Sequence, residues 1–183
     1  MQDYVYFDLE TQRTISDVGG TKFKGDLKMS VGVTYSTKDN KYVVYGEDRV
    51  HDLIEQLLSA DCVVGYNHIS FDYEVLMGYD WRDLQTSIPS LDMLVDIEEK
   101  LGHRLPLESI AKASLGAGKT ADGLQAIRWW REGKLMEIAE YCCYDVKVTK
   151  MVHEFGAEHG YVKYEDRFNR IQAVDVDWKT AEA

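Results

Sequence analysis

The chain has 183 residues, 45% of them hydrophobic and 29% charged, which is typical of one soluble domain with a sizeable core. Its net charge of −11 argues against a protein that holds long duplex nucleic acid through a basic face. The same charge is compatible with an enzyme whose carboxylates hold divalent cations, because the cations supply positive charge at a phosphate.

Three further features concern location. The sequence contains no run of about 18 apolar residues, so it predicts no membrane-spanning segment. Residues 1–3 contain neither the basic region nor the apolar segment of an export signal. The three cysteines form no disulfide framework and no metal-ligand spacing, so we expect a reducing, intracellular, cytoplasmic location.

Two acidic residues end the first predicted strand, residues 4–11. Its first half is β-branched and aromatic, as in a buried strand. Asp8 and Glu10 are two residues apart, so their side chains point to the same side. Carboxylates after such an apolar run are costly to bury unless they are paired, either with a divalent metal or with a nearby Lys or Arg.

The next segments predict a mixed sheet. Residues 11–26 are polar and glycine-rich, which indicates a loop. Residues 28–35 and 41–45 predict the two strands of a hairpin. Residues 48–59 have the apolar spacing of an amphipathic helix, and residues 61–65 form a short apolar strand. This order of elements predicts a mixed sheet with helices packed on it.

A polar turn follows this strand. Ser70 is placed to cap a helix that runs to residue 77, with Asp72 in its first turn, where the helix dipole favours an acid. A functional interpretation places Asp72 at the carboxyl end of a strand, where α/β sheets bind their ligands. The amide of Asn67 could reach a phosphate or a sugar, whereas His68 is expected to be a loop histidine.

Residues 89–98 predict a fifth strand that runs into a helix, with Asp92 as the helix cap rather than a further metal ligand. Residues 107–115 predict another helix, opened by Pro106 at its first turn.

A glycine-rich segment at residues 116–120 resembles a phosphate-binding loop, but Ala113 stands where that motif requires glycine. We expect a surface loop, either plain or carrying Lys119 to a nucleic-acid phosphate. Residues 128–131 read Arg-Trp-Trp-Arg. These rings either stack on bases or, as we favour, pack with one tryptophan in the core and the other at the surface.

A long helix is predicted at residues 134–159. Tyr141 and Asp145 are four residues apart, so they lie one turn from each other. They flank an apolar stripe formed by Leu135, Ile138, Ala139, Cys142, Val146 and Thr149. This position suggests the wall of a cleft; the alternative is a surface aspartate beside a packed tyrosine.

After this helix, residues 160–168 and 171–178 alternate like the strands of a hairpin. We therefore expect a domain at residues 1–160 and a C-terminal extension at residues 161–183, consisting of this hairpin and a frayed end.

Three segments together resemble the motifs of the DEDD 3′–5′ exonuclease superfamily: Y-x-D-L-E-T at residue 6, N-x-x-x-F-D at residue 67 and Y-x-x-x-D at residue 141. The resemblance covers residues 1 to about 160. A sister subfamily has histidine where Glu140 stands, so the chain resembles the DEDDy branch. It is most similar to stand-alone exonucleases related to the exonuclease domain of family B DNA polymerases, which proofread.

The resemblance implies an α/β, ribonuclease H-like fold: a five-stranded mixed sheet, with its first three strands antiparallel, flanked by helices. It implies two divalent ions, Mg²⁺ or Mn²⁺. Asp8 would bridge both, Glu10 and Asp145 would complete one site, and Asp72 would serve the other. Tyr141 would orient the attacking water.

The resemblance implies shortening of nucleic acid from its 3′ end to nucleoside 5′-monophosphates. Because the chain has no basic arm, we expect single-stranded ends rather than long duplex as the substrate, and DNA more than RNA. Asn67, Phe71 and Lys119 are the expected substrate-binding residues, and a polymerase or helicase is an expected partner in trans. Two alternatives remain open, namely a catalytically silent nucleic-acid-binding module and a ribonuclease H-like endonuclease.

Overall fold

The computed structural model describes residues 2–116 and 123–179. Lys119 and most of the predicted glycine-rich loop therefore lie outside the described residues. The strands are β1 (Tyr4–Thr11), β2 (Met29–Ser36), β3 (Lys41–Gly46), β4 (Cys62–Gly65), β5 (Ser90–Asp92), β6 (Tyr161–Glu165) and β7 (Ile171–Asp175). The helices are α1 (Val50–Ser59), α2 (Asp72–Leu76), α3 (Leu84–Ser87), α4 (Met93–Leu101), α5 (Leu107–Leu115), α6 (Gly123–Arg131) and α7 (Leu135–His159), with 3-10 helices η1 (Thr21–Leu27) and η2 (Glu47–Arg49).

The main sheet has five strands in the order β3-β2-β1-β4-β5. The pairs β1–β2 and β2–β3 are antiparallel, whereas β4 lies parallel to β1 and β5 parallel to β4. Strands β6 and β7 form a separate antiparallel pair. The predicted α/β fold, with its antiparallel first three strands and its C-terminal hairpin, is confirmed.

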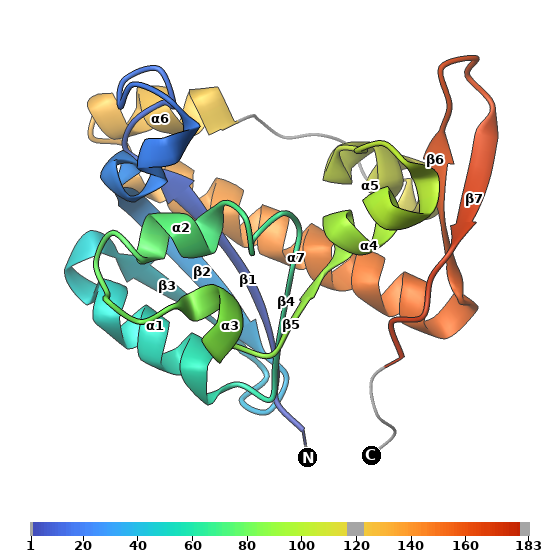
Figure 1. Cartoon of the computed structure of the whole chain (residues 1–183), viewed down its shortest axis with the longest axis horizontal. Coiled ribbons are helices and arrows are strands. Elements are labelled where there is room, and N and C mark those ends of the chain that lie inside the picture. Colours follow the sequence, from blue (N-terminus) through green and yellow to red (C-terminus); the bar gives the residue numbers. More distant parts are fainter. Residues whose placement is uncertain (1, 117–122, 180–183) are drawn as a thin grey trace.

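Helices cover both faces of the sheet (Figure 1). Val5, Phe7 and Leu9 of β1 pack into one core with α1, α2 and α3. Tyr6 points to the other face and packs into the core that contains α7. Side chains alternate along a strand, so Asp8 and Glu10 share the face of Tyr6 and point toward α7.

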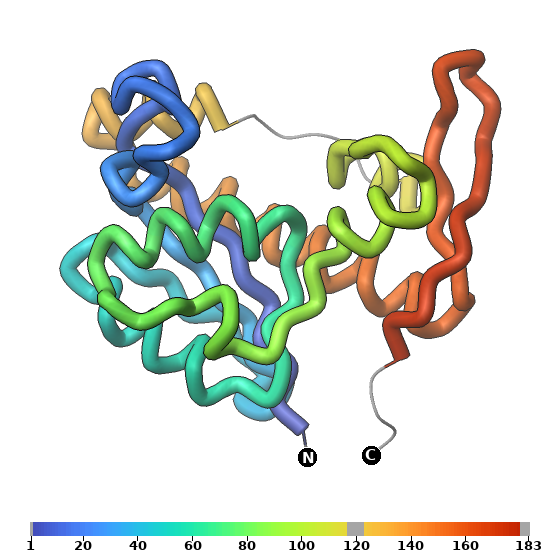
Figure 2. The backbone as a smooth tube through the Cα atoms, in the orientation of Figure 1, coloured from blue at the N-terminus to red at the C-terminus, as the bar shows by residue number. Residues whose placement is uncertain are grey.

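The hairpin and the residues after it belong to the α7-side core. Val162, Val174, Val176 and Trp178 are buried there. Figure 2 shows the hairpin rising at one end of α7, opposite the end at which α6 lies. Within the described residues, no helix combines the length and the apolarity needed to cross a membrane.

Three local predictions are wrong. Helix α2 begins at Asp72 without a side-chain cap, because the hydroxyl of Ser70 donates instead to Asn67 Oδ1 at 2.9 Å. Trp129 and Trp130 are both half-buried against the α7-side core, since α6 turns each ring only partly inward. Leu135 is 49% exposed because the packed stripe of α7 begins one turn later.

Candidate active site

Strand β1 extends further than its parallel neighbour β4, so the last part of β1 has an edge that β4 does not cover. The candidate site lies at this uncovered part. Strand β4 pairs with β1 only along Tyr4–Tyr6, whereas β1 continues to Thr11. On the edge that β4 leaves uncovered, the side chain of Asp72 binds the backbone of β1, because the Leu9 N–H donates to Asp72 Oδ1 at 3.1 Å. Asp72, at the start of α2, is thereby fixed beside the acidic end of β1.

Three carboxylates meet at this place. Asp8 and Glu10 from β1 and Asp145 from α7 each offer an oxygen within 4.8 Å of the others. Glu10 is only 8% exposed. Burial raises the pKa of Asp8, the negative charge of Asp145 raises it further, and a hydrogen bond from Cys142 opposes both effects. The structure thus brings together three of the four predicted acids.

Asp72 lies outside this group of three but next to it. Its side chain is buried, and burial raises its pKa, as does the charge of Asp8; the Leu9 N–H opposes the shift. Asp8 is therefore the acid that interacts with both sides of the site, with Asp145 on one side and with Asp72 on the other.

Cys142 also contacts this acid cluster. The sequence did not indicate a functional role for Cys142. Its thiol donates to Asp8 Oδ2 at 3.5 Å and to the Asp8 carbonyl at 3.4 Å. The only sequence signal was its place in the apolar stripe of α7, one residue after Tyr141.

The phenol of Tyr141 lies at the edge of the same cluster. Burial raises its pKa, and so do the charges of Asp145 and Glu10; a side-chain hydrogen bond joins Tyr141 to Asp145. The ring of Trp129 packs against Tyr141 edge-on, with the ring centroids 6.3 Å apart. Tyr141 therefore keeps its proton at neutral pH and acts as a fixed hydrogen-bond donor.

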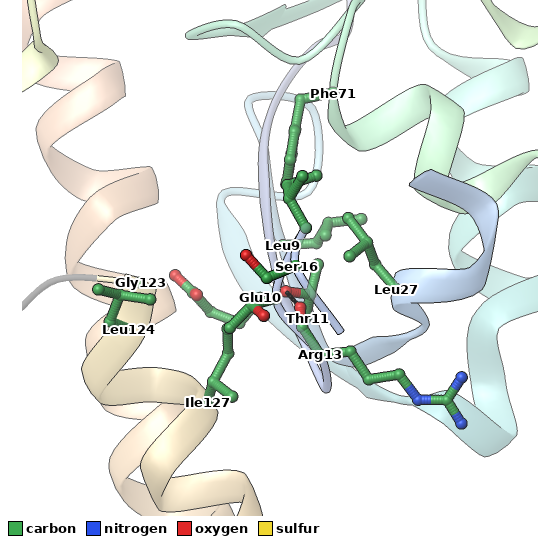
Figure 3. A pocket seen from close by; sticks show the side chains of 12 residues that line it. Leu9, Glu10, Thr11, Arg13, Ser16, Leu27, Phe71, Gly123, Leu124 and Ile127 are labelled. Carbon is green, nitrogen blue, oxygen red and sulfur yellow. Dashed lines mark hydrogen bonds between the residues drawn. The ribbon is translucent and has the colours of Figure 1, made fainter. Parts of the chain in front are cut away.

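A cleft of about 540 Å³ opens beside Glu10. Figure 3 shows the Glu10 side chain between the end of β1 and α6. The apolar part of the lining comes from Leu9, Ile15, Leu27, Phe71, Leu124 and Ile127. The polar part includes Arg13, Thr14 and Ser16. Phe71, a predicted substrate-binding residue, thus lines a cleft that shares a wall with the carboxylates.

An ion pair joins the two walls of this cleft. Arg131 of α6 contacts Asp17 of the loop after β1, with Nη2 and Oδ2 2.9 Å apart. Asp17 is held in turn by the Thr14 N–H at 2.8 Å. No sequence pattern predicts this pair, because the two residues are 114 positions apart.

Asp92 organises the turn that precedes Asp72. It caps α4 through the Leu94 N–H, as predicted, and it also accepts from the N–H groups of Asn67 (2.7 Å) and Ile69 (3.1 Å). Asn67 adopts a positive φ of 67°, and its Oδ1 accepts from Ser70 and Arg104. Asn67 does not line the cleft.

His68 lies in the same turn but belongs to the core. It is 1% exposed, and its ring contacts that of Tyr73 edge-on, with the centroids 5.0 Å apart. His68 does not line the cleft beside Glu10.

The acid cluster fits a divalent cation. Carboxylate oxygens are the ligands that Mg²⁺ and Mn²⁺ prefer. The carboxylate oxygens of Asp8, Glu10 and Asp145 lie within 4.8 Å of one another and repel one another when charged, and a bound cation would remove this repulsion.

Comparison with known proteins agrees with the geometry. A sequence profile of the RNase H superfamily matches residues 5–155. The family B DNA polymerase from the hyperthermophilic archaeon Pyrobaculum calidifontis is similar in fold, with a TM-score of 0.66 and 14% identity over 85% of this chain. This chain spans only 24% of that polymerase chain. Curated protein sequences gave no match. Because the profile covers most of the chain, the protein belongs to the RNase H superfamily.

Proposed function

We propose that the protein is a 3′–5′ exonuclease that degrades single-stranded nucleic acid, DNA in preference to RNA, to nucleoside 5′-monophosphates. Membership in the RNase H superfamily indicates a metal-dependent nuclease. One observation carries the finer proposal: the Asp8–Glu10–Asp145 cluster has the Tyr141 phenol hydrogen-bonded to Asp145.

Asp8, Glu10 and Asp145 would hold one divalent cation, and Asp72, beside Asp8, would serve a second. Such ions, Mg²⁺ or Mn²⁺, stabilise the attacking and leaving oxygens of an in-line displacement at phosphorus. The two acids of β1 and the one of α7 approach from different elements, so the phosphate would be held at the junction of the sheet and the helix.

Tyr141 would orient the attacking water. Its phenol retains its proton because burial and the neighbouring carboxylates raise its pKa, so it does not serve as a base at neutral pH. It donates this proton to Asp145, and its oxygen would accept a hydrogen bond from the attacking water. Asp145 fixes the direction of the phenol through their shared hydrogen bond. Orientation of a reacting group in this way lowers the entropic part of the barrier.

The cleft would take the terminal nucleotide. Phe71 and Leu9 offer apolar surface to a base, and Glu10 lies where the cleft meets the carboxylates. The Arg131–Asp17 pair joins the two walls, which favours entry of a chain end over passage of an internal segment. Asn67 lies outside this cleft, in the turn before Asp72, and its Nδ2, which donates to none of the described residues, would be available there to a phosphate or a sugar.

Digestion of 5′-labelled single-stranded DNA and RNA tests this function. We expect a ladder that shortens by one nucleotide at a time from the 3′ end with Mg²⁺ or Mn²⁺, but not with chelator or in Asp8→Ala. A circular single strand should survive. Cutting of the circle would identify an endonuclease instead, and nucleic-acid binding without any cleavage would identify a silent binding module.

A further inference from the structure

The tip of the β6–β7 hairpin presents an aromatic ring between two cations. Phe168 is 60% exposed. The guanidinium carbon of Arg167 lies 4.8 Å from the centre of its ring, and that of Arg170 lies 5.0 Å from it. Each cation lies within the range of a cation–π contact, so the ring is held in place although most of its surface faces solvent.

The turn that carries this ring is fixed by Asp166. Its carboxylate accepts from the N–H groups of Phe168 (2.8 Å) and Arg170 (3.0 Å) and from Arg170 Nε (3.0 Å). Gln172 donates to it as well, at 3.2 Å. A tip ordered in the free protein loses little conformational entropy when a ligand stacks on it.

The tip also carries two arginines in an acidic chain, directly after Glu165 and Asp166. Residues 167–170 contain two arginines and no acid, whereas the whole chain has a net charge of −11. Arg170 is paired with Asp166 at 2.9 Å. Within residues 2–116 and 123–179, Arg167 has no carboxylate at ion-pairing distance, so its guanidinium is available to a phosphate.

Trp81 shows that an exposed ring alone does not make such a site. It is 93% exposed, but the neighbouring Arg82 is bound by Asp80 and by Glu55, each at 2.6 Å. The cation next to that ring in the sequence is therefore already paired. The combination at Phe168 suits a ligand with a π face and a phosphate, which is the chemistry of an unpaired nucleotide.

We propose that Arg167 and Phe168 form a second binding site for single-stranded nucleic acid, with a base stacked on Phe168 and a phosphate at Arg167. This inference rests on the proposed function for its ligand class. From Asp145, α7 continues to His159, roughly 20 Å along the helix axis, before the hairpin begins. Figure 1 shows the hairpin rising from that end of α7, with its tip turned away from the helix. The site therefore holds nucleotides several positions upstream of the strand end being cleaved.

Binding of fluorescent single strands in chelator tests the site without turnover. Phe168→Ala and Arg167→Ala are compared with wild type on strands of about 4 and about 20 nucleotides. The controls are Trp81→Ala for the exposed ring and Arg49→Ala for the charge. We expect each tip variant to bind the long strand about tenfold more weakly and the short strand as wild type does, with both controls unchanged.

The salt dependence separates the two roles. We expect Arg167→Ala to lower the slope of log K against log salt by about 0.7, as for one lost phosphate contact to a single strand, and Phe168→Ala to leave it unchanged. Wild-type affinity for the long strand in both tip variants would overturn the proposal. An equal loss on a blunt duplex would overturn it too, because paired bases cannot stack on Phe168.

The same proteins separate this proposal from the nuclease assignment. Cleavage of the short strand with Mg²⁺ by Phe168→Ala at the wild-type rate, with unchanged binding of the long strand, would reject the tip and leave the nuclease. Tip-dependent binding by a wild-type protein that cleaves nothing would support the tip and reject the nuclease.

Discussion

The Tyr141 phenol and the Asp145 carboxylate share a hydrogen bond across one turn of α7. The helix fixes their spacing, and the packing of Trp129 against the Tyr141 ring fixes the direction of the phenol. Both residues face the two acids at the end of β1. The phenol oxygen and the carboxylate are thus held together at the place where a water would attack.

Tyr141→Phe should lower kcat about 100-fold and leave KM nearly unchanged, because it removes the group that orients water but no contact with the substrate. The measurement is steady-state cleavage of a single-stranded oligonucleotide. Tyr161→Phe, on β6, is the matched control and should retain wild-type kcat. Equal kcat values in Tyr141→Phe and wild type would remove Tyr141 from the mechanism.

Asp8→Asn should abolish cleavage and, in chelator, raise the melting temperature by a few degrees. The substitution removes one negative charge from a cluster of like charges, and about 1 kcal/mol corresponds to 2–4 °C in a chain of this size. Mn²⁺ should stabilise wild type but not Asp8→Asn. Thermal denaturation with and without metal measures both effects, with exposed Asp39→Asn as control. Equal stabilisation of Asp8→Asn by Mn²⁺ would contradict this site.

Leu124→Trp should raise KM about tenfold, because the larger ring enters the cleft beside Glu10. Leu124 is 59% exposed, so the fold should tolerate the change, and stabilisation by Mn²⁺ should remain as in wild type. Leu135→Trp, at a residue 49% exposed on α7, is the control. An unchanged KM in Leu124→Trp would show that substrate does not use this cleft.

Gly156→Ala should destabilise the protein by about 1–3 kcal/mol. A Cβ at this position would lie 2.4 Å from the Trp178 ring and 3.0 Å from Val176. In a Trp178→Ala background the ring is absent, so the same change should be neutral or stabilising because alanine favours the helix. Urea denaturation of the two single variants and the double variant tests this. If the destabilisation of the double variant equalled the sum of those of the two single variants, the predicted clash between a Cβ at position 156 and the Trp178 ring would be contradicted.

Acid should destabilise the protein through His153. Burial lowers its pKa from 6.5 to about 4, so between these values the unfolded chain binds a proton that the folded chain excludes. The free energy of unfolding falls by about 1.4 kcal/mol per pH unit in that window and is fully retained above pH 6.5. Urea denaturation at pH 7 and at pH 5 measures this fall in the free energy of unfolding. The fall should be smaller in His153→Gln than in wild type, whereas exposed His51→Gln should show the wild-type fall. A parallel pH dependence in His153→Gln and wild type would contradict the assignment.

Patterns within single elements were sufficient for much of the fold. Helix α7 begins one residue later than predicted, at Leu135, and α1 begins at Val50 rather than at residue 48. Strand alternation predicted that Asp8 and Glu10 share a face, and helix periodicity predicted that Asp145 flanks a buried stripe. Once α7 packs against the sheet, the face of β1 and the face of α7 that these periodicities predict bring the three acids together.

The remainder depends on contacts that no local pattern encodes. Serine is a favourable residue type for a helix N-cap, which is why the sequence predicts Ser70 as the cap of α2. Asp92, more than 20 positions later, instead accepts hydrogen bonds from the backbone N–H groups of this turn and fixes it in another conformation. The Arg131–Asp17 pair likewise depends on where α6 docks against the loop after β1. Such placements follow from the assembled fold rather than from the residues of one segment.

The four acids come from both layers around the sheet. Asp8 and Glu10 belong to β1, Asp145 to the helix behind the sheet and Asp72 to the helix in front of it. Local opening of α7 would carry Asp145 away, and opening of α2 would carry Asp72 away, without any change to the carboxylates themselves. The proposed metal site would therefore be complete only while α2 and α7 are both packed against β1, so local opening of either helix would disassemble it while the rest of the fold remained.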